Sequence, residues 1–349
     1  MSIYNRILVI YTGGTIGMLP SDRGLVPGTG FAARALSMLD TLPVLQRRQL
    51  PELDFVEYDT PIDSSNARPH HWQRIAADIV SHYERYDGFV VLHGTDTLAW
   101  TASSLAFQLK GLGKAVVVTG SQRPLGTAGS DALANLEQAI RFASLPALKE
   151  VAVAFGGHLL RGCRTRKWDT HADQGFASPN FAALGQWLEG FPILYPSRLW
   201  LAESAPAFEL HDYTGMASDA VVRLPLWPGI EADILDRLLS GDRVRALLLE
   251  GWGSGNVPSD HAFLGVLAEA ISAGRHVAVI SQCPHGGIDM STYATGRLLR
   301  DVGVLAGDDM TPEAAFTKLV HLSAQSASDT DRQREYFLTP IAGERSAVT

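Results

Sequence analysis

The chain has 349 residues, of which 46% are hydrophobic and 19% are charged, and its formal net charge is −8 at pH 7. These values predict a globular protein of two domains with a sizeable core, and the acidic balance argues against nucleic acid or an anionic membrane surface as a partner. Because no apolar run reaches about 18 residues, no secretory signal is recognisable and the two cysteines stand far apart, we expect a cytoplasmic protein with reduced thiols.

Apolar segments alternate with amphipathic helical segments from the amino terminus to about residue 156. The apolar segments predict strands at 6–11, 53–58, 88–93, 115–119 and 150–155. Between them, apolar residues at helical spacing predict helices, of which the clearest are at 69–86 and 132–143. Such alternation indicates a mostly parallel sheet that is flanked by helices on both faces.

Residues 191–216 interrupt this alternation, because three prolines stand there among residues without periodicity. We expect them to link an N-terminal α/β domain, residues 1–190, to a smaller C-terminal α/β domain, residues 217–349. In the second domain the patterns predict strands near 219–224, 245–249 and 276–281, and helices near 229–240, 259–273, 291–301, 311–323 and 327–337. The predicted fold class is therefore α/β in both domains.

Two of the predicted strands end in turns that contain glycine and threonine. The strand at 6–11 leads into Thr12-Gly13-Gly14-Thr15, and the strand at 88–93 leads into Gly94-Thr95-Asp96. Ligands of open α/β folds bind outside the carboxyl ends of the strands, and glycine turns offer backbone N–H groups to a developing oxyanion. One such turn alone is typical of a tight connection, but the pair favours an active site.

Four segments offer polar side chains to such a site, namely 12–15, 63–65, 95–96 and 164–167. A threonine is a poor nucleophile unless a base or proton relay activates it. Lys167 is a candidate for that role, since a desolvated lysine gives up its proton readily, and Asp96 is placed to orient the lysine. Simpler interpretations stay open: Asp96 as a helix cap, residues 63–65 as an ordinary turn, and Lys167 as a solvated charge. The residues alone indicate a small-molecule enzyme with paired threonines.

Residues 11–17 and 92–97 resemble the two signature segments of the asparaginase/glutaminase amidohydrolase family, most closely its bacterial cytoplasmic (type I) L-asparaginase branch. Further segments support the resemblance, at 118–122, 161–162, 176–180, 255–258 and 293–296. The likeness extends from about residue 4 to residue 320. It implies a larger N-terminal mostly parallel sheet domain, a smaller C-terminal α/β domain, and a homodimer or homotetramer.

The resemblance also implies a reaction and roles for individual residues. The reaction is hydrolysis of the side-chain amide of L-asparagine to L-aspartate and ammonia, without a metal or organic cofactor. Thr15 matches the nucleophile that forms an acyl-enzyme, and Thr95, Asp96 and Lys167 match a triad that moves a proton. The substrate-binding positions are Asp63, Ser64, Ser65, Gly94, Asp96, and an Asn256 supplied by the neighbouring chain.

Two positions depart from the family pattern. Leu25 stands where the family usually has a loop tyrosine whose hydroxyl reaches the nucleophilic threonine, so we expect weak turnover or activation of Thr15 by another group. Tyr11 is adjacent in sequence. Glu250 stands where some cytoplasmic members have a basic residue near an effector site for asparagine. An acidic group would repel the carboxylate of the effector, so we do not expect allosteric activation.

Three alternatives to an asparaginase stay open. A glutaminase or mixed asparaginase–glutaminase would differ mainly in pocket size, and one methylene changes discrimination by only about 1–3 kcal/mol. An amidotransferase subunit built on the same domain usually carries an extra N-terminal domain, whereas the first predicted strand here begins at residue 6. A catalytically weak amino-acid-binding homologue would fit Leu25, but it would not explain the retention of Thr15, Thr95, Asp96 and Lys167 together.

Overall fold

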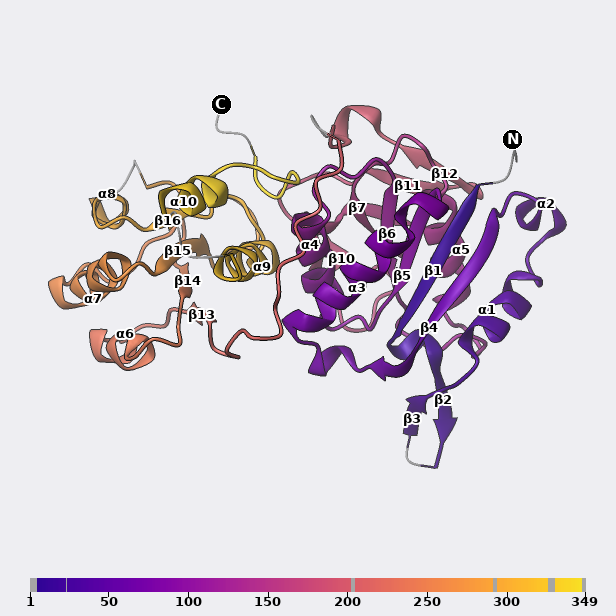
Figure 1. Cartoon of the computed structure of the whole chain (residues 1–349), viewed down its shortest axis with the longest axis horizontal. Helices are drawn as coiled ribbons and strands as arrows, with labels where there is room; N and C mark the ends of the chain where they lie inside the picture. The colour runs from indigo at the N-terminus through magenta and orange to yellow at the C-terminus, as the bar shows by residue number, and fades with distance from the viewer. Residues whose placement is uncertain (1–4, 23, 202–204, 291–293, 326–329, 347–349) are drawn as a thin grey trace. The chain divides into compact units, whose positions relative to one another are not determined.

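A computed structural model describes residues 5–22, 24–201, 205–290, 294–325 and 330–346. The chain divides into two compact units, Met1–Leu210 and His211–Thr349 (Figure 1). Both units are α/β, as the sequence predicts. None of the helices among the described residues is long and apolar enough to cross a membrane.

In the described part of the N-terminal unit, eight strands form one sheet in the order β12-β11-β8-β7-β6-β5-β1-β4. The strands at 6–11, 53–58, 88–93, 115–119 and 150–155 are confirmed, as β1 (Arg6–Gly13), β4 (Glu52–Ile62), β5 (Gly88–Leu92), β6 (Ala115–Thr119) and β7 (Val151–Phe155). These five pair in parallel. Antiparallel strands extend the sheet on one side, namely β8 (His158–Arg161), β11 (Gly185–Leu188) and β12 (Phe191–Leu194). The sheet is therefore mostly parallel, with an antiparallel edge.

Helices cover both faces of this sheet. They are α1 (Phe31–Leu39), α2 (Val44–Arg47), α3 (Pro69–His82), α4 (Leu98–Gln108) and α5 (Ala132–Ala143). The predicted helix at 132–143 coincides with α5, and the one at 69–86 corresponds to α3 followed by a 3-10 turn at Tyr83–Arg85. Pro69 occupies the first turn of α3, where its missing N–H group costs nothing.

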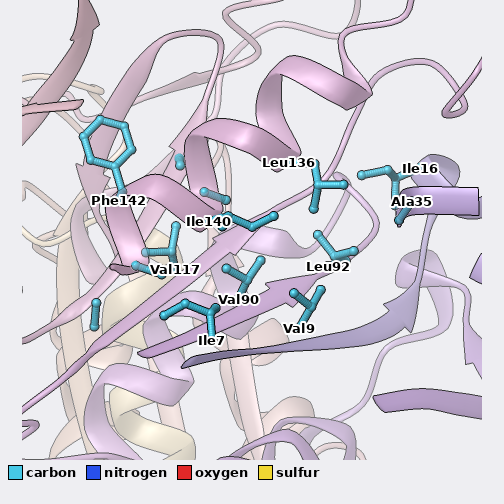
Figure 2. Packing of buried hydrophobic residues seen from close by; sticks show 14 of the residues in the cluster. Ile7, Val9, Ile16, Ala35, Val90, Leu92, Val117, Leu136, Ile140 and Phe142 are labelled. Carbon is cyan, nitrogen blue, oxygen red and sulfur yellow. The ribbon is translucent and has the colours of Figure 1, made fainter. Parts of the chain in front are cut away.

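Alternate residues of the parallel strands point to the two faces of the sheet. One set packs against α1 and α5 and forms a hydrophobic core with residues of these helices and of the turn after β1. Figure 2 labels the following residues of this core: Ile7, Val9, Ile16, Ala35, Val90, Leu92, Val117, Leu136, Ile140 and Phe142. The other set includes Leu8 and Ile10, which are also buried. Full burial of each large aliphatic side chain contributes about 1.5–3 kcal/mol. This core holds the carboxyl ends of β1 and β5 in fixed positions.

The sequence prediction lacks the antiparallel strands β8, β11 and β12, and it also lacks two short hairpins that lie outside the main sheet. One consists of β2 (Met18–Ser21) and β3 (Gly24–Pro27) and leaves the sheet directly after β1. The other consists of β9 (Arg166–Lys167) and β10 (Phe176–Ala177). Both lie next to residues that the sequence assigns to the active site.

The described part of the C-terminal unit holds a parallel sheet of four strands, β13 (Val221–Pro225), β14 (Ala246–Gly251), β15 (His276–Ser281) and β16 (Leu305–Ala306). Its helices are α6 (Ala232–Leu239), α7 (His261–Ser272), α8 (Ala294–Asp301), α9 (Pro312–Ser323) and α10 (Thr330–Leu338). They match the five predicted helices, although residues 291–293 and 327–329 of two predictions lie outside the described residues. Asp260 and Thr311 cap α7 and α9 by accepting hydrogen bonds from Phe263 N and Ala314 N.

The predicted connection over residues 191–216 differs from the structure at its beginning. Phe191–Leu194 form β12 at the edge of the N-terminal sheet, paired with β11. Proline is compatible with this place, because an edge strand leaves one row of backbone groups unpaired. The division between the two units falls after Leu210.

Candidate active site

The first glycine–threonine turn follows β1 directly. Gly13 and Gly14 have φ angles of 132° and 89°, which residues with side chains rarely adopt. Thr15 then begins a 3-10 turn, Thr15–Gly17, that is closed by a hydrogen bond from Gly17 N to Gly14 O. Thr15 is half-buried, whereas Ile16 is fully buried. The turn therefore holds the Thr15 backbone firmly while its side chain keeps some access to solvent.

The second turn follows β5, which is the parallel neighbour of β1. His93 is completely buried, and its two ring nitrogens lie 2.8 Å from Gly94 O and 3.0 Å from Thr101 Oγ1. A carbonyl oxygen only accepts, so Nδ1 carries the proton and Nε2 accepts from Thr101. Burial lowers the pKa of His93 to about 4, so the ring is neutral at pH 7. His93 is a structural histidine, since both ring nitrogens are held within this unit.

The two turns contact each other and a third segment. A side chain added at Gly14 would overlap the backbone of Gly94, and one added at Gly94 would overlap Ser64 Oγ. Thr97 Oγ1 donates a hydrogen bond of 2.7 Å to Ser64 O. Three predicted segments, 12–15, 63–65 and 94–96, are thus brought together at one edge of the sheet, and glycine is required where they touch.

Lys167 reaches the second turn from β9. Its Nζ lies 2.9 Å from Thr95 Oγ1 and 2.6 Å from Asp96 Oδ1. The Lys167 side chain is 23% exposed and that of Asp96 is 60% exposed, so one end of this cluster faces solvent. Lys167 is therefore not an isolated solvated charge. Such an arrangement can pass a proton between the hydroxyl of Thr95 and the amine, while the carboxylate orients the amine.

Asp96 does not cap the helix that follows it. Helix α4 begins at Leu98, its N-cap residue is Thr97, and no side chain accepts a hydrogen bond there. Asp96 lies one residue before the N-cap and is paired with Lys167 instead. The interpretation of Asp96 as a helix cap is therefore wrong.

Asp63 and its neighbours form a capped turn. The Asp63 carboxylate accepts from Ser65 N and from Asn66 Nδ2, both at 3.0 Å, at the start of the 3-10 turn Ser64–Asn66. Ser64 is buried, whereas Asp63 and Ser65 are exposed. This cap fixes the direction of the turn beside Gly94. Binding of substrate by Asp63, Ser64, Ser65 and Gly94 stays a prediction.

Asn256 lies in the C-terminal unit, after β14. Its backbone exchanges hydrogen bonds with Trp252, from Asn256 N to Trp252 O at 2.8 Å and from Trp252 N to Asn256 O at 2.9 Å. These bonds form a tight turn that ends the strand. The role of Asn256 in the active site of a neighbouring chain stays a prediction.

Leu25 and Tyr11 occupy different surroundings. Leu25 lies on β3 opposite Pro20 and is 48% exposed. The Tyr11 ring stacks on Phe31 with centroids 4.3 Å apart, and its hydroxyl lies against Gly17, so that a side chain at Gly17 would overlap it. The hydroxyl is buried and makes no hydrogen bond with any described residue, and burial raises its pKa. Tyr11 therefore does not replace the missing loop tyrosine by a direct bond to Thr15.

Glu250 lies at the carboxyl end of β14 and is buried, with Arg223 Nε paired to its carboxylate. The negative charge of Glu250 is thus paired with the positive charge of Arg223 in the same unit. The expectation that asparagine does not activate the protein allosterically stays a prediction.

Two family models match the chain. The model described as "Asparaginase, N-terminal" matches residues 6–197, and the model described as "Glutaminase/Asparaginase C-terminal domain" matches residues 220–337. L-asparaginase 1 of Escherichia coli (strain K12) is 42% identical over 344 residues, which cover 97% of each chain. The 60 kDa lysophospholipase of Homo sapiens is 35% identical over 356 residues, which cover 97% of this chain and 61% of that protein.

A solved structure shares the fold over the whole chain. The crystal structure of L-asparaginase I from Vibrio cholerae superposes with a TM-score of 0.86 at 35% sequence identity. The match covers 99% of this chain and 100% of that one.

Proposed function

Because the chain belongs to the asparaginase family of amidohydrolases, we propose that it hydrolyses the side-chain amide of L-asparagine to L-aspartate and ammonia. The observation that carries this proposal is the cluster of Lys167, Thr95 and Asp96 beside the turn of Thr15. The relatives named above include L-asparaginases that match over nearly the whole chain.

Thr15 acts as the nucleophile in this proposal. Its Oγ attacks the side-chain carbonyl carbon of asparagine, the C–N bond breaks, and the hydroxyl proton leaves with the nitrogen as ammonia. The product of this step is an aspartyl ester of Thr15. A water molecule then attacks the ester carbon, and the proton that it gives up returns to Thr15 Oγ as aspartate departs. Backbone N–H groups of the two glycine turns stabilise the oxyanion formed in each half.

Thr95, Lys167 and Asp96 move protons during both halves of the reaction. Lys167 Nζ contacts the hydroxyl and the carboxylate at hydrogen-bond distance, so the amine is held in one orientation. A positioned group of this kind contributes about 10²–10⁴-fold to a rate. Asp96, with the turn at 63–65 and Gly94, also holds the α-amino and α-carboxylate groups of the substrate.

The test is ammonia release from asparagine and from glutamine, measured side by side on the purified full chain. We expect turnover of asparagine and a lower kcat/KM for glutamine, because a pocket shaped for the shorter side chain misplaces the longer amide. Turnover of glutamine equal to that of asparagine would identify a mixed asparaginase–glutaminase. Ammonia release from neither amino acid would overturn the proposal.

We also propose that the protein is cytoplasmic and acts as a homodimer or homotetramer whose sites are completed by Asn256 of a second chain. Mixing two inactive variants, Thr15→Ala and Asn256→Ala, tests this arrangement. In a randomly mixed dimer, one site in each heterodimer retains both native residues, so about a quarter of all sites become active. No recovery from a mixture that light scattering shows to have exchanged subunits would contradict the role of Asn256.

A further inference from the structure

The turn of Thr15 is also the neck of the β2–β3 hairpin. The chain leaves the turn at Gly17, forms β2 and β3 of the hairpin, and returns at Gly28. Gly28 N donates a hydrogen bond of 3.3 Å to Gly17 O, which closes the neck. A side chain at Gly28 would lie 2.9 Å from that same oxygen. Gly17 O therefore joins the nucleophile turn to both ends of the hairpin.

Arg34 contacts this oxygen from helix α1. Its Nη2 donates a hydrogen bond of 2.8 Å to Gly17 O. The helix itself is held in place by Glu57 of β4, whose carboxylate accepts from Phe31 N at 2.9 Å and Ala32 N at 2.8 Å. An acidic group at a helix N-terminus also interacts favourably with the helix dipole. The sheet thus anchors α1, and α1 carries Arg34 to the neck.

The surroundings of the Arg34 guanidinium leave it little freedom. It lies over the Phe31 ring, 5.6 Å from the ring centroid, and Phe31 in turn stacks on Tyr11. Its Nε and Nη1 atoms are shielded from solvent and have no hydrogen-bond partner among the described residues. A buried donor without a partner costs about 1–3 kcal/mol, so such groups are uncommon in folded proteins. The hydrogen bond to Gly17 O is therefore the contact that defines the place of this side chain.

We propose that Arg34 is a positioning residue that fixes the turn of Thr15 and the neck of the β2–β3 hairpin through Gly17 O. This inference rests on the proposed function, because it gives Arg34 a part in the reaction of Thr15. Among the described contacts, Arg34 touches neither the turn at 63–65 nor Lys167, so its effect passes through Gly17 O to the turn of Thr15 and to the neck of the hairpin. Loss of the contact lets the turn and the hairpin move relative to Thr95, Asp96 and Lys167.

The test compares Arg34→Met with Arg34→Lys and with Arg47→Met, all in the full chain. Arg47 is a matched control, since its Nη1 also donates to a backbone carbonyl, that of Asp40, but at an exposed place away from the turn. We expect Arg34→Met to lower kcat for asparagine about tenfold or more, as expected for loss of a charged hydrogen bond, while KM changes less than about threefold. We expect Arg34→Lys to retain most of the activity, because an ammonium also donates to a carbonyl.

Hydrogen exchange gives a second measurement that does not depend on activity. The amide of Gly28 should exchange about tenfold faster in Arg34→Met, while the amides of β5 keep their rates and show that the sheet remains folded. If the unmodified protein releases no ammonia from asparagine, the proposed function fails, and exchange at Gly28 still decides whether Arg34 holds the neck. An Arg34→Met protein whose kcat and Gly28 exchange stay within twofold of the unmodified values would overturn the inference. A lysine variant as impaired as the methionine variant would also overturn it.

Discussion

Lys167 in the N-terminal unit and Lys318 in the C-terminal unit each pair with a carboxylate, but in different surroundings. Lys167 is 23% exposed, its partner Asp96 is 60% exposed, and the hydroxyl of Thr95 is its second contact. Lys318 and its partner Glu344 are both fully buried. Lys318 Nζ also donates to Phe337 O at 3.0 Å and to Thr339 O at 2.7 Å.

The pair of Lys318 is closed off from solvent, whereas the pair of Lys167, to which we assign a part in the proposed reaction, is open to it. An ammonium has three N–H donors, and among the described residues those of Lys318 are taken up by the Glu344 carboxylate and the carbonyls of Phe337 and Thr339. Glu344 also accepts from the backbone of Ile341 and Ala342, which orients its carboxylate, and its pairing with Lys318 ties this segment to helix α9. Lys167 instead holds a hydroxyl and a carboxylate at the edge of the sheet, where a substrate can reach them. Burial and complete pairing favour stability, whereas partial exposure favours reaction.

The largest effect is expected on activity at Lys167. Lys167→Met should lower kcat/KM for asparagine by about 10²–10⁴-fold, because it removes the group that exchanges a proton with Thr95. The free energy of unfolding should change by less than about 1 kcal/mol, since pairs exposed to solvent contribute little to stability. Arg166→Met is the matched control, because arginine does not give up its proton. Equal losses in both variants would indicate a general electrostatic role of the segment.

The next effect is expected on stability at Lys318. Lys318→Met leaves the Glu344 carboxylate buried without its partner and should lower the free energy of unfolding by about 3–5 kcal/mol. Urea unfolding measures this change. The double variant Lys318→Met/Glu344→Gln should recover part of the loss, because a neutral amide is less costly to bury and still accepts from Ile341 N. A single variant as stable as the unmodified chain would break the comparison.

A smaller effect concerns stability against pH at His93. Burial lowers the pKa of His93 to about 4 in the folded chain, whereas an unperturbed histidine has a value of about 6.5. The unfolded chain therefore takes up a proton at higher pH, and the contribution of His93 to stability, complete above about pH 6.5, is lost as the pH falls towards 4. We expect a loss of about 2 kcal/mol between pH 7 and pH 5 that His93→Gln removes. Parallel stability–pH curves of the two proteins would contradict this.

The smallest effect is expected at Leu25. This side chain is 48% exposed on β3, so a tyrosine fits there without displacing a neighbour. If the loop tyrosine that the family usually has at this position acts through its hydroxyl, Leu25→Tyr should raise kcat, by less than about tenfold. Leu25→Phe, which adds the ring without the hydroxyl, should leave kcat unchanged. If the hairpin acts mainly by excluding water, neither change should matter. An unchanged or lower kcat in a folded Leu25→Tyr protein would contradict a role for the missing hydroxyl in the activation of Thr15.

The main parallel strands of both units, and the helices of the C-terminal unit, could be predicted from the sequence because their signals are local. Buried parallel strands such as 115–119 are continuous apolar runs, and α5 carries one apolar stripe over 132–143. The β2–β3 hairpin was not predictable, since its residues are mostly exposed and carry no alternation. Helix α1 was missed as well, because a glycine rather than a capping side chain precedes it and its cap comes from Glu57.

The site was predictable as a set of residues and only partly as an arrangement. The two glycine turns and the resemblance pointed to Thr15, Thr95, Asp96 and Lys167, but the contact between Lys167 and Asp96 spans 71 positions in the chain. The direction in which a side chain points could not be predicted from the sequence. The hydroxyl of Tyr11, for example, points to Gly17 and makes no hydrogen bond to Thr15. Arg34 lies in no recognisable sequence motif, so its proposed positioning role rests on its hydrogen bond to Gly17 O in the structure.

The central claim is that Thr15 forms the covalent intermediate while the Lys167 cluster moves protons. Excess asparagine is mixed with the enzyme, the reaction is stopped with acid within one turnover, and the protein is digested with trypsin, which separates residues 7–23 from residues 86–110. Mass spectrometry should find an aspartyl group on the peptide that contains Thr15, and none in Thr15→Ala. An aspartyl group on the peptide that contains Thr95, with Thr15 unmodified, would contradict the account.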